Sequence, residues 1–388
     1  MKLYSPKLSL TLQVFLISGL FYLSNIFGLN IFKITFNQIG TFDDFEKLLT
    51  LEPNAFANRE TFGVTPFLID FYRQINFFPT NLLIWIYSCF NLLMILFVLN
   101  RIIKSKLVIL IILTSWPFIF LISRGNNDIW VFCILILLSF NLINYKTLNS
   151  ILVGLLFSID PLICIVLLIL FYNFNKIQAK FVLLTIVFLN APLLIRKDLI
   201  TFENLVSFIT QLTGFRNKMV VQGDGSLFSN SLEYFSKAFF NILKFNPDNL
   251  SIIVLLVNIT VLSMALSSLM SVKLRDPYFK YFYFGIFITA YLLIFSPSPD
   301  YKLIFLAIPM LGNLSLQRPI NNFRFEFLLI MSIWLPKHFI FFGASDIFSG
   351  YTISTLINPI LLLILLTYYL RRIKNSHFNL TNKVKSDF

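Results

Sequence analysis

The chain has 388 residues, of which 57% are hydrophobic and 13% charged, and its formal net charge is +13. This composition excludes a soluble domain with an ordinary surface and indicates an all-α protein with many membrane-spanning helices. A positive balance in such a protein is typical of basic cytoplasmic loops, so we expect no nucleic acid partner. Cys89, Cys133 and Cys164 lie in apolar runs without metal-ligand spacing, and we therefore predict no metal centre and no cofactor.

Apolar segments of about 15 to 20 residues recur along the chain, and a single helix needs about this length to cross a membrane. The first of them has no small-residue cleavage site, so we interpret it as a retained span rather than a signal peptide. We expect spans near residues 8–28, 80–99, 107–123, 129–143, 181–195, 251–270, 281–296, 302–316, 325–342 and 352–370.

Segment 148–174 decides the predicted topology. Pro161 removes a helical hydrogen bond and disfavours helix at the preceding Asp160, so we predict a broken hairpin with its tip at these two residues. With this hairpin, the basic loops all face the cytoplasm, and the chain makes about twelve helical passes with both termini inside. We expect a single integral membrane domain over residues 1–388, and the frequent Phe, Ile, Asn and Lys suggest a bacterial inner membrane.

This topology places two long loops, 29–79 and 196–250, on the external side. Each loop contains a stretch with aromatic and aliphatic residues at helical spacing, 60–78 in the first and 232–244 in the second. We predict that both stretches form helices lying in the membrane interface.

Several charged residues sit close to the predicted external surface. Asp43 and Asp44 follow the first span, where a carboxylate could act as a general base on an acceptor hydroxyl. Alternatively, they belong to the start of a helix, where acidic residues are favoured. Asp160 lies at the tip of the predicted hairpin, and an ionisable residue at membrane depth normally faces a cavity.

The sequence LISRGNNDIW joins two predicted spans and contains Arg124, Asn126 and Asp128. An arginine beside the exposed amides of a helix N-terminus can bind a phosphate group. In the alternative interpretation, Asp128 or Asn127 caps the following helix, while the Arg124 side chain extends to the membrane interface.

Further candidates occur late in the chain. Asp300 and Lys302 lie in SPSPDYKLIFLAIPML at the start of a predicted span, either as a local ion pair or with Lys302 neutralising a lipid-linked phosphate. Lys337 and His338 follow Pro336 in the outer half of the predicted span 325–342. Either side chain could contact a phosphate, and His338 could carry a proton, although Lys337 could instead extend outward.

Together these motifs resemble the multi-span glycosyltransferases of the GT-C type, and among them glycosyltransferase family 87, the polyprenol-phosphate-mannose-dependent mannosyltransferases. The resemblance covers most of the chain. It rests on the motifs DDF at 43–45, RGNND at 124–128, SIDPLICIVLL at 158–168, GDGSLFSNSLEYF at 223–235 and SPSPDYKLIFLAIPML at 296–311.

The resemblance implies an enzyme that transfers a hexose, mannose in that family, from a polyprenyl-phosphate donor to a lipid or glycan acceptor on the extracytoplasmic face. It implies Asp44 as the catalytic base, with Asp43 in reserve. Donor phosphate binding would fall to Arg124, Lys302, Lys337 and His338, and the substrate pocket would include Asn126, Asp128, Asp160 and Asp300. The sequence departs from the family where Asp160 replaces a lysine. A secondary transporter, a lipid flippase or a non-catalytic scaffold remains the alternative.

Overall fold

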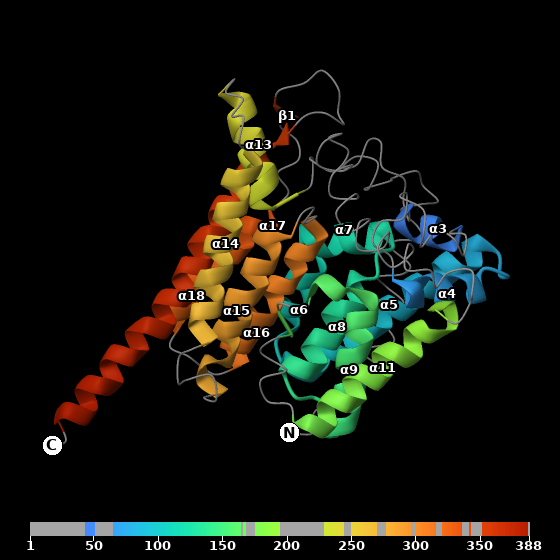
Figure 1. Ribbon diagram of the computed structural model, residues 1–388, viewed down its shortest axis with the longest axis horizontal. Helices are drawn as coiled ribbons and strands as arrows, with labels where there is room; N and C mark the ends of the chain where they lie inside the picture. The colour runs from blue at the N-terminus through green and yellow to red at the C-terminus, as the bar shows by residue number, and fades with distance from the viewer. Residues whose placement is uncertain are drawn as a thin grey trace. The chain divides into compact units, whose positions relative to one another are not determined.

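The computed structural model describes residues 43–50, 65–163, 166–167, 175–194, 229–243, 250–269, 277–295, 300–315, 320–335, 341–342 and 351–386. Over these ranges the chain is helical, apart from β1 (Phe341–Phe342) and β2 (Tyr351–Thr352), which pair antiparallel. Figure 1 shows the helices in chain order from blue to red. The predicted all-α class is confirmed.

Among the described residues, three helices are long and apolar enough to cross a membrane. They are α5 (Thr80–Ile102), α14 (Leu250–Leu269) and the first part of α18 (Ile353–Ser386). A bent pair, α6 (Lys106–Leu113) and α7 (Trp116–Arg124), gives a fourth candidate if it is counted as one span. These helices are consistent with a membrane protein, whereas the number of passes and their orientation stay predictions.

The span predicted at 107–123 is a bent pair of helices, because α6 and α7 meet at an angle of 56°. Pro117 is the second residue of α7, a position in the first turn where its missing N–H leaves no helical hydrogen bond unmade. Had one helix continued through this point, the proline ring would have met the carbonyl four residues earlier, at Leu113. The helix therefore ends at Leu113 and restarts at Trp116.

The predicted break at Asp160 and Pro161 is confirmed. Helix α9 (Lys146–Ile159) ends one residue before Asp160, whose backbone is extended, with φ −132° and ψ 94°. Pro161 then begins the short 3₁₀ helix η2 (Pro161–Ile163). Most of the predicted return arm, at residues 164–165 and 168–174, lies outside the described residues, so the hairpin itself stays a prediction.

Two further spans begin or end differently from the prediction. Helix α8 (Asp128–Ser139) stops short of residue 143 because Asn141 takes a left-handed conformation, with φ 49°. Its backbone N–H donates to the Leu138 carbonyl, as at many helix C-termini. The span expected at 302–316 is a 3₁₀ helix, η5 (Asp300–Leu306), followed by α16 (Ala307–Ser315).

The predicted span at 325–342 is also wrong at its C-terminal end. Helix α17 (Ile320–Trp334) stops before Pro336, which is consistent with the bias against helix in the residue preceding a proline. Residues 341–342 are not helical but pair with Tyr351 and Thr352. Lys337 and His338 lie outside the described residues, so their interpretation as phosphate or proton contacts stays a prediction.

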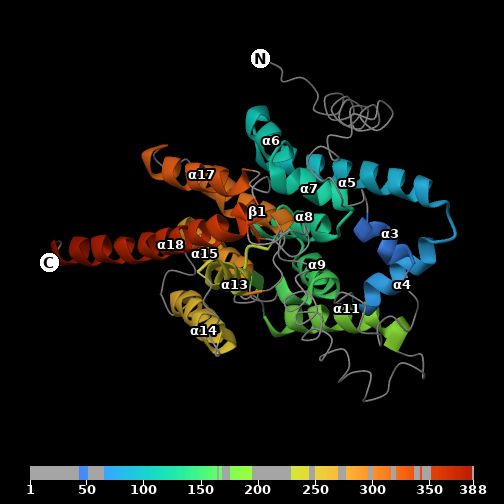
Figure 2. The ribbon, with the colours of Figure 1, turned by 90° about the horizontal axis from the view of Figure 1, so that it is seen from above.

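The chain divides into two compact units. Unit 1 comprises Met1–Thr114, Phe118–Asp160 and Ile177–Phe208, and unit 2 comprises Ser115–Pro117, Pro161–Lys176 and Ile209–Phe388. In unit 1, α8 packs against α5 and α9, and α4 (Pro66–Ile75) packs against α9 and α3 (Asp43–Leu49). Helix α11 (Lys176–Leu194) lies along α9, as Figure 2 also shows. The prediction of one integral membrane domain is not tested by this division.

In unit 2, α15 (Pro277–Ile294) is the central helix. It packs against α14, α16, α18 and α13 (Leu232–Ile242), and Figure 1 shows α14, α15 and α18 running side by side. Nearly every side chain of α15 from residue 279 to residue 293 is buried, which explains why this helix is apolar on all sides. Helices α4 and α13 confirm that the stretches 60–78 and 232–244 contain helices; their place at a membrane interface stays a prediction.

Candidate functional site

The predicted acidic segment forms the start of a helix. Asp43 and Asp44 are the first two residues of α3, where the helix dipole favours negative charge. The structure describes their backbone, whereas their side chains lie outside the described part. Phe45, the next residue, is 1% exposed and fixes the helix to the rest of unit 1.

Phe45 belongs to a closed cluster of five aromatic rings drawn from α3, α4, α5 and α8. Its ring centroid lies 5.5 Å from that of Tyr72 and 4.5 Å from that of Tyr87. Phe71 and Trp130 complete the cluster, since Phe71 contacts Tyr72 and Trp130, and Trp130 contacts Tyr87. Edge-to-face pairs at such distances add to the burial of the rings, so the cluster is a rigid base for α3.

Tyr72 connects this aromatic cluster to the turn that contains Arg124. Its hydroxyl donates a 2.5 Å hydrogen bond to Oδ1 of Asn127, and both side chains are buried. Asn127 lies between α7, which ends at Arg124, and α8, which begins at Asp128. The helix that begins with Asp43 and Asp44 is therefore connected, within unit 1, to the turn after Arg124 that was predicted to bind a phosphate.

The turn itself depends on Gly125 and Asn126. Gly125 has a φ of 63°, a left-handed conformation that ends α7 and that glycine adopts most easily. Asn126 Oδ1 accepts a 2.9 Å hydrogen bond from the backbone N–H of Asp128. Asn127 occupies the predicted N-cap position of α8 but makes no side-chain cap bond, and Asn126 accepts from the Asp128 N–H instead. Asp128, in the first helical turn, is buried, and Arg124 is half-buried.

These bonds also change how the turn could bind a phosphate. The first amides of α8 already have acceptors, since Asp128 N–H donates to Asn126 Oδ1 and Trp130 N–H donates to the Asn127 carbonyl at 2.9 Å. These amides are therefore not free to bind a phosphate group, contrary to what the sequence had led us to expect. Any phosphate recognition at this turn would come from the guanidinium of Arg124.

Asp160 lies next to a polar cluster that the sequence did not reveal. Thr65 Oγ1 donates to the backbone carbonyl of Ser158, and Asn190 Nδ2 donates to Ser158 Oγ at 3.1 Å. Asn190 Oδ1 accepts in turn from the backbone N–H of Phe67 at 3.2 Å. These bonds join the start of α4 and the C-terminal part of α11 to the end of α9. Asp160, half-buried, is therefore positioned by its neighbours in unit 1.

Asp300 is the centre of a buried polar network in unit 2. The carboxylate, 1% exposed, accepts hydrogen bonds from Trp116 Nε1 at 3.1 Å, Asn230 Nδ2 at 2.9 Å and Ser354 Oγ at 3.4 Å. Asn358 Nδ2 donates to both Asn230 Oδ1 and Ser354 Oγ at 2.9 Å. A buried carboxylate needs donors of this kind, and these residues come from segments far apart in the sequence.

Lys302 lies two residues after Asp300 in η5. Its Nζ donates a 2.6 Å hydrogen bond to the hydroxyl of Tyr291 on α15 and lies 5.1 Å from the centroid of that ring. The ammonium group is thus held on an aromatic side chain at a partly buried position. Of the cationic residues predicted for the donor phosphate, Arg124 is placed in unit 1 and Lys302 in unit 2.

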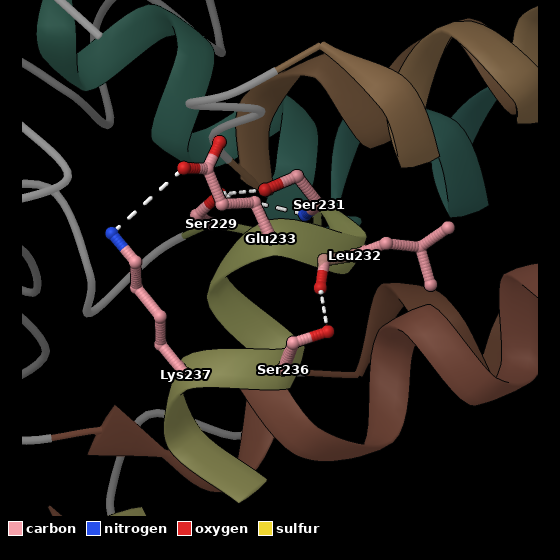
Figure 3. A network of polar contacts seen from close by, with 6 residues as sticks. All are labelled: Ser229, Ser231, Leu232, Glu233, Ser236 and Lys237. Atoms are coloured by element: carbon pink, nitrogen blue, oxygen red, sulfur yellow. Dashed lines mark hydrogen bonds and ion pairs between the residues drawn. The ribbon is translucent and has the colours of Figure 1, made fainter. Parts of the chain in front are cut away.

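The segment that precedes α13 is linked to Asp300 through Asn230, and Figure 3 shows the polar contacts of its serines and of the first turns of α13. Ser229 and Ser231, on either side of Asn230, approach each other with their hydroxyl oxygens 3.2 Å apart. Ser231 N–H donates to Ser229 Oγ at 3.4 Å, which closes a tight turn at the start of the helix. Glu233 in the first helical turn faces Lys237 at 3.8 Å. This turn positions Asn230 so that its Nδ2 donates to Asp300.

Sequence reasoning missed a second buried carboxyl group. Glu326 on α17 is 1% exposed and bonds to Asn313 of α16 and Tyr369 of α18. The signal was available, because Glu326 is an acidic residue inside an expected span. Among the described residues, no three His, Cys, Asp or Glu side chains are grouped so that they could hold a metal ion.

No family model, no curated protein and no solved structure matches this chain. Within unit 1, the structure brings α3 to the turn of Arg124, Asn126 and Asp128, while Asp300 and Lys302 share η5 in unit 2. The resemblance to glycosyltransferases therefore rests on sequence motifs, and the positions of these residues are the physical basis for a proposal.

Proposed function

We propose that the chain is a membrane glycosyltransferase that transfers a hexose, mannose by resemblance, from a polyprenyl-phosphate donor to a lipid or glycan acceptor on the extracytoplasmic face. The observation that supports this most is the contact path from Phe45 through Tyr72 to Asn127. It keeps the helix that begins with Asp43 and Asp44 beside the turn that follows Arg124. The aromatic cluster thus connects the helix that bears the candidate base to the turn that follows the candidate phosphate-binding cation.

The proposed reaction inverts the configuration at the anomeric carbon of the transferred sugar. Asp44 accepts the proton of the acceptor hydroxyl, the hydroxyl oxygen forms a bond to the anomeric carbon, and the bond from that carbon to the phosphate oxygen breaks. The leaving group is polyprenyl phosphate, whose negative charge Arg124 stabilises. Lys302 is proposed as a second phosphate contact on the basis of the resemblance, and Asp128, Asp160 and Asp300 as residues of the sugar and acceptor pocket, together with Asn126.

The sharpest test replaces Asp44 with Asn and measures hexose transfer from a polyprenyl-phosphate hexose by the purified protein. Asn cannot accept the proton, so we expect turnover to fall by about two orders of magnitude or more. Asp43→Asn tests the reserve base. Glu46→Gln is the matched control, because Glu46 is an exposed acid of the same helix. Normal transfer by both aspartate variants and by the double variant would exclude this mechanism, since Asn replaces Asp well at the start of a helix.

The phosphate contacts are tested separately. Arg124→Gln and Lys302→Gln are expected to raise KM for the donor more than they lower kcat, because each loses a charge that binds the donor phosphate. Arg101→Gln is the control, since Arg101 is an exposed cation at the end of α5. An unchanged donor KM in both test variants would contradict their assignment.

A secondary transporter or lipid flippase is the second candidate, and the helix breaks favour it. Interrupted helices near a binding site are typical of transporters. Here the chain is interrupted between Leu113 and Trp116, at Asp160, and where η5 joins α16. Reconstitution into vesicles distinguishes the two functions, because a transporter moves substrate across the bilayer without forming a glycosidic bond, whereas the proposed enzyme forms that bond with acceptor present on one side.

The predicted topology is tested with single cysteines in a cysteine-free background. Thr50 and Lys176 are suitable positions, because both are exposed. A membrane-impermeant thiol reagent added to intact cells should label a cysteine at position 50 and should label one at position 176 only after the cells are opened. External labelling at position 176 would contradict the hairpin at Asp160 and the cytoplasmic termini.

A further inference from the structure

A second site in unit 2, formed by Glu326, Asn313 and Tyr369, does not take part in the proposed transfer. The Glu326 carboxyl group joins three helices, since Asn313 is on α16, Glu326 on α17 and Tyr369 on α18. Asn313 Nδ2 lies 2.8 Å from both carboxyl oxygens, and the Tyr369 hydroxyl donates to Oε1 at 2.8 Å. The three side chains are at most 2% exposed.

The amide oxygen of Asn313 is a second feature of this site. While its Nδ2 contacts Glu326, its Oδ1 is buried and makes no hydrogen bond. A buried acceptor without a donor is unfavourable, so this arrangement leaves one amide oxygen unsatisfied. Rotation of the amide by about 180° exchanges its two ends and turns Oδ1 toward the Glu326 carboxyl group. An ionised carboxylate would repel that oxygen, whereas a protonated carboxyl group would donate to it.

Other asparagines of this chain show where the amide nitrogen would go. Asn190 Nδ2 donates to the backbone carbonyl four residues earlier, at Ile186, while its Oδ1 accepts from another segment. Asn100 Nδ2 donates in the same way to the carbonyl of Leu96. In the same pattern, the Nδ2 of a rotated Asn313 would donate to the carbonyl of Pro309, four residues earlier in the sequence. A rotated Asn313 would then have both ends of its amide paired.

We propose that Glu326 is a proton-binding site and that the occupied site has this rotated geometry. The bound proton lies on one carboxyl oxygen and donates to Asn313 Oδ1, while the Tyr369 hydroxyl continues to donate to the other oxygen. Protonation removes a negative charge from a fully buried position, where an ion is much less stable than in water. The ligand of this site is a hydrogen ion, and the inference does not depend on the proposed sugar transfer.

The other titratable groups on the packed elements have contacts of their own. On α18, Arg372 Nε donates to the hydroxyl of Tyr368 at 3.3 Å. On α15, which packs against α16, Lys280 Nζ lies 5.9 Å from the ring centroid of Tyr281. Further titratable groups on these elements include the exposed Arg324 on α17 itself and the exposed Arg371 and Lys374 on α18. They also include Asp300, Tyr301 and Lys302 on η5, and Tyr281, Tyr283 and Tyr291 on α15. Tyr369 is a titratable group with a direct bond to Glu326.

Infrared spectroscopy of the purified full chain in lipid nanodiscs tests the proposal, because the carbonyl stretch of a protonated carboxyl group is separate from that of a carboxylate. We expect a protonated-carboxyl band at neutral pH that Glu326→Gln removes. Gln keeps the fold, since its amide can donate to Asn313 Oδ1 and accept from Tyr369. Asp300→Asn is the matched control, because it changes another carboxyl group of the same unit that is also 1% exposed and should leave the Glu326 band in place.

Two variants keep Glu326 and change its partners. Asn313→Leu and Tyr369→Phe each remove one hydrogen bond to the carboxyl group, so each should shift the frequency of the same band while the band persists. The proposal is overturned if the wild-type protein shows no band at neutral pH that depends on Glu326. It is equally overturned if the band is present but unaffected by both partner variants, because the protonated carboxyl group would then not be bonded to Asn313 and Tyr369.

Discussion

Gly285 on α15 gives the most direct test of how unit 2 is packed. A Cβ atom added at this position would lie 2.4, 2.5 and 2.7 Å from three atoms of the Tyr369 ring. These distances are shorter than van der Waals contact, and Tyr369 is fully buried, so the ring has to move. Because its hydroxyl bonds Glu326, the movement also weakens that bond.

The magnitude for Gly285→Ala follows from three terms. Overpacking a core costs about 1 to 3 kcal/mol, and the lost Tyr369 hydrogen bond costs about 1 kcal/mol. Replacing a helical glycine with alanine stabilises the helix by about 1 kcal/mol through helix propensity. We therefore expect a net loss of about 1 to 3 kcal/mol in the free energy of unfolding, which is about 5-fold to more than 100-fold in the unfolding equilibrium constant.

Equilibrium unfolding of the purified protein in mixed micelles measures this loss. The control is Gly285→Ala combined with Tyr369→Leu, whose smaller side chain leaves room for the new methyl group. In that background, adding Gly285→Ala should be neutral or stabilising, whereas in the wild type it should destabilise. A Gly285→Ala protein that is more stable than the wild type by about the helix-propensity gain would refute the close approach of α15 and α18.

Three further changes test other parts of the structure by the same unfolding measurement. Gly312→Ala places a Cβ 2.0 Å from Cδ1 of Tyr281, so we expect a loss of about 1 to 3 kcal/mol, and a stable variant would contradict the packing of α16 on α15. Gly125→Ala must hold a φ of 63° with a side chain, which should cost about 1 kcal/mol, whereas Gly125→Asn should cost less. Tyr72→Phe removes the hydroxyl that bonds Asn127, and it should lower the free energy of unfolding by about 1 to 3 kcal/mol and raise KM for the sugar donor. If stability and KM were both unchanged, the link between α3 and the proposed site would be refuted.

The amino-acid sequence was sufficient to predict the helical membrane class and several helices. The apolar run that forms α5 is long enough to cross a bilayer, and its helical ends differ little from the predicted 80–99. The break before Pro161 was also predictable, because the restriction that a proline places on the preceding residue is local. The spacing of aromatic residues likewise predicted α4 and α13 from a pattern within one segment.

The same local restriction explains the break before Pro117, whereas hydropathy alone merges α6 and α7 into one apolar segment. A hydropathy average measures how apolar a segment is and contains no information on its direction, so a bend leaves the average unchanged. The end of α17 before Pro336 follows from the same local restriction by a proline.

Only the tertiary structure decided which polar residues meet. Asp300 accepts from Trp116, Asn230 and Ser354, which are separated from it by 184, 70 and 54 positions. Glu326 is likewise joined to Tyr369 across 43 positions. Charge and spacing indicated that Asp300 is important, but they gave no sign of these partners. Hydropathy and proline rules act over one or a few turns of a helix, whereas a buried carboxyl group needs donors from whichever helices pack around it.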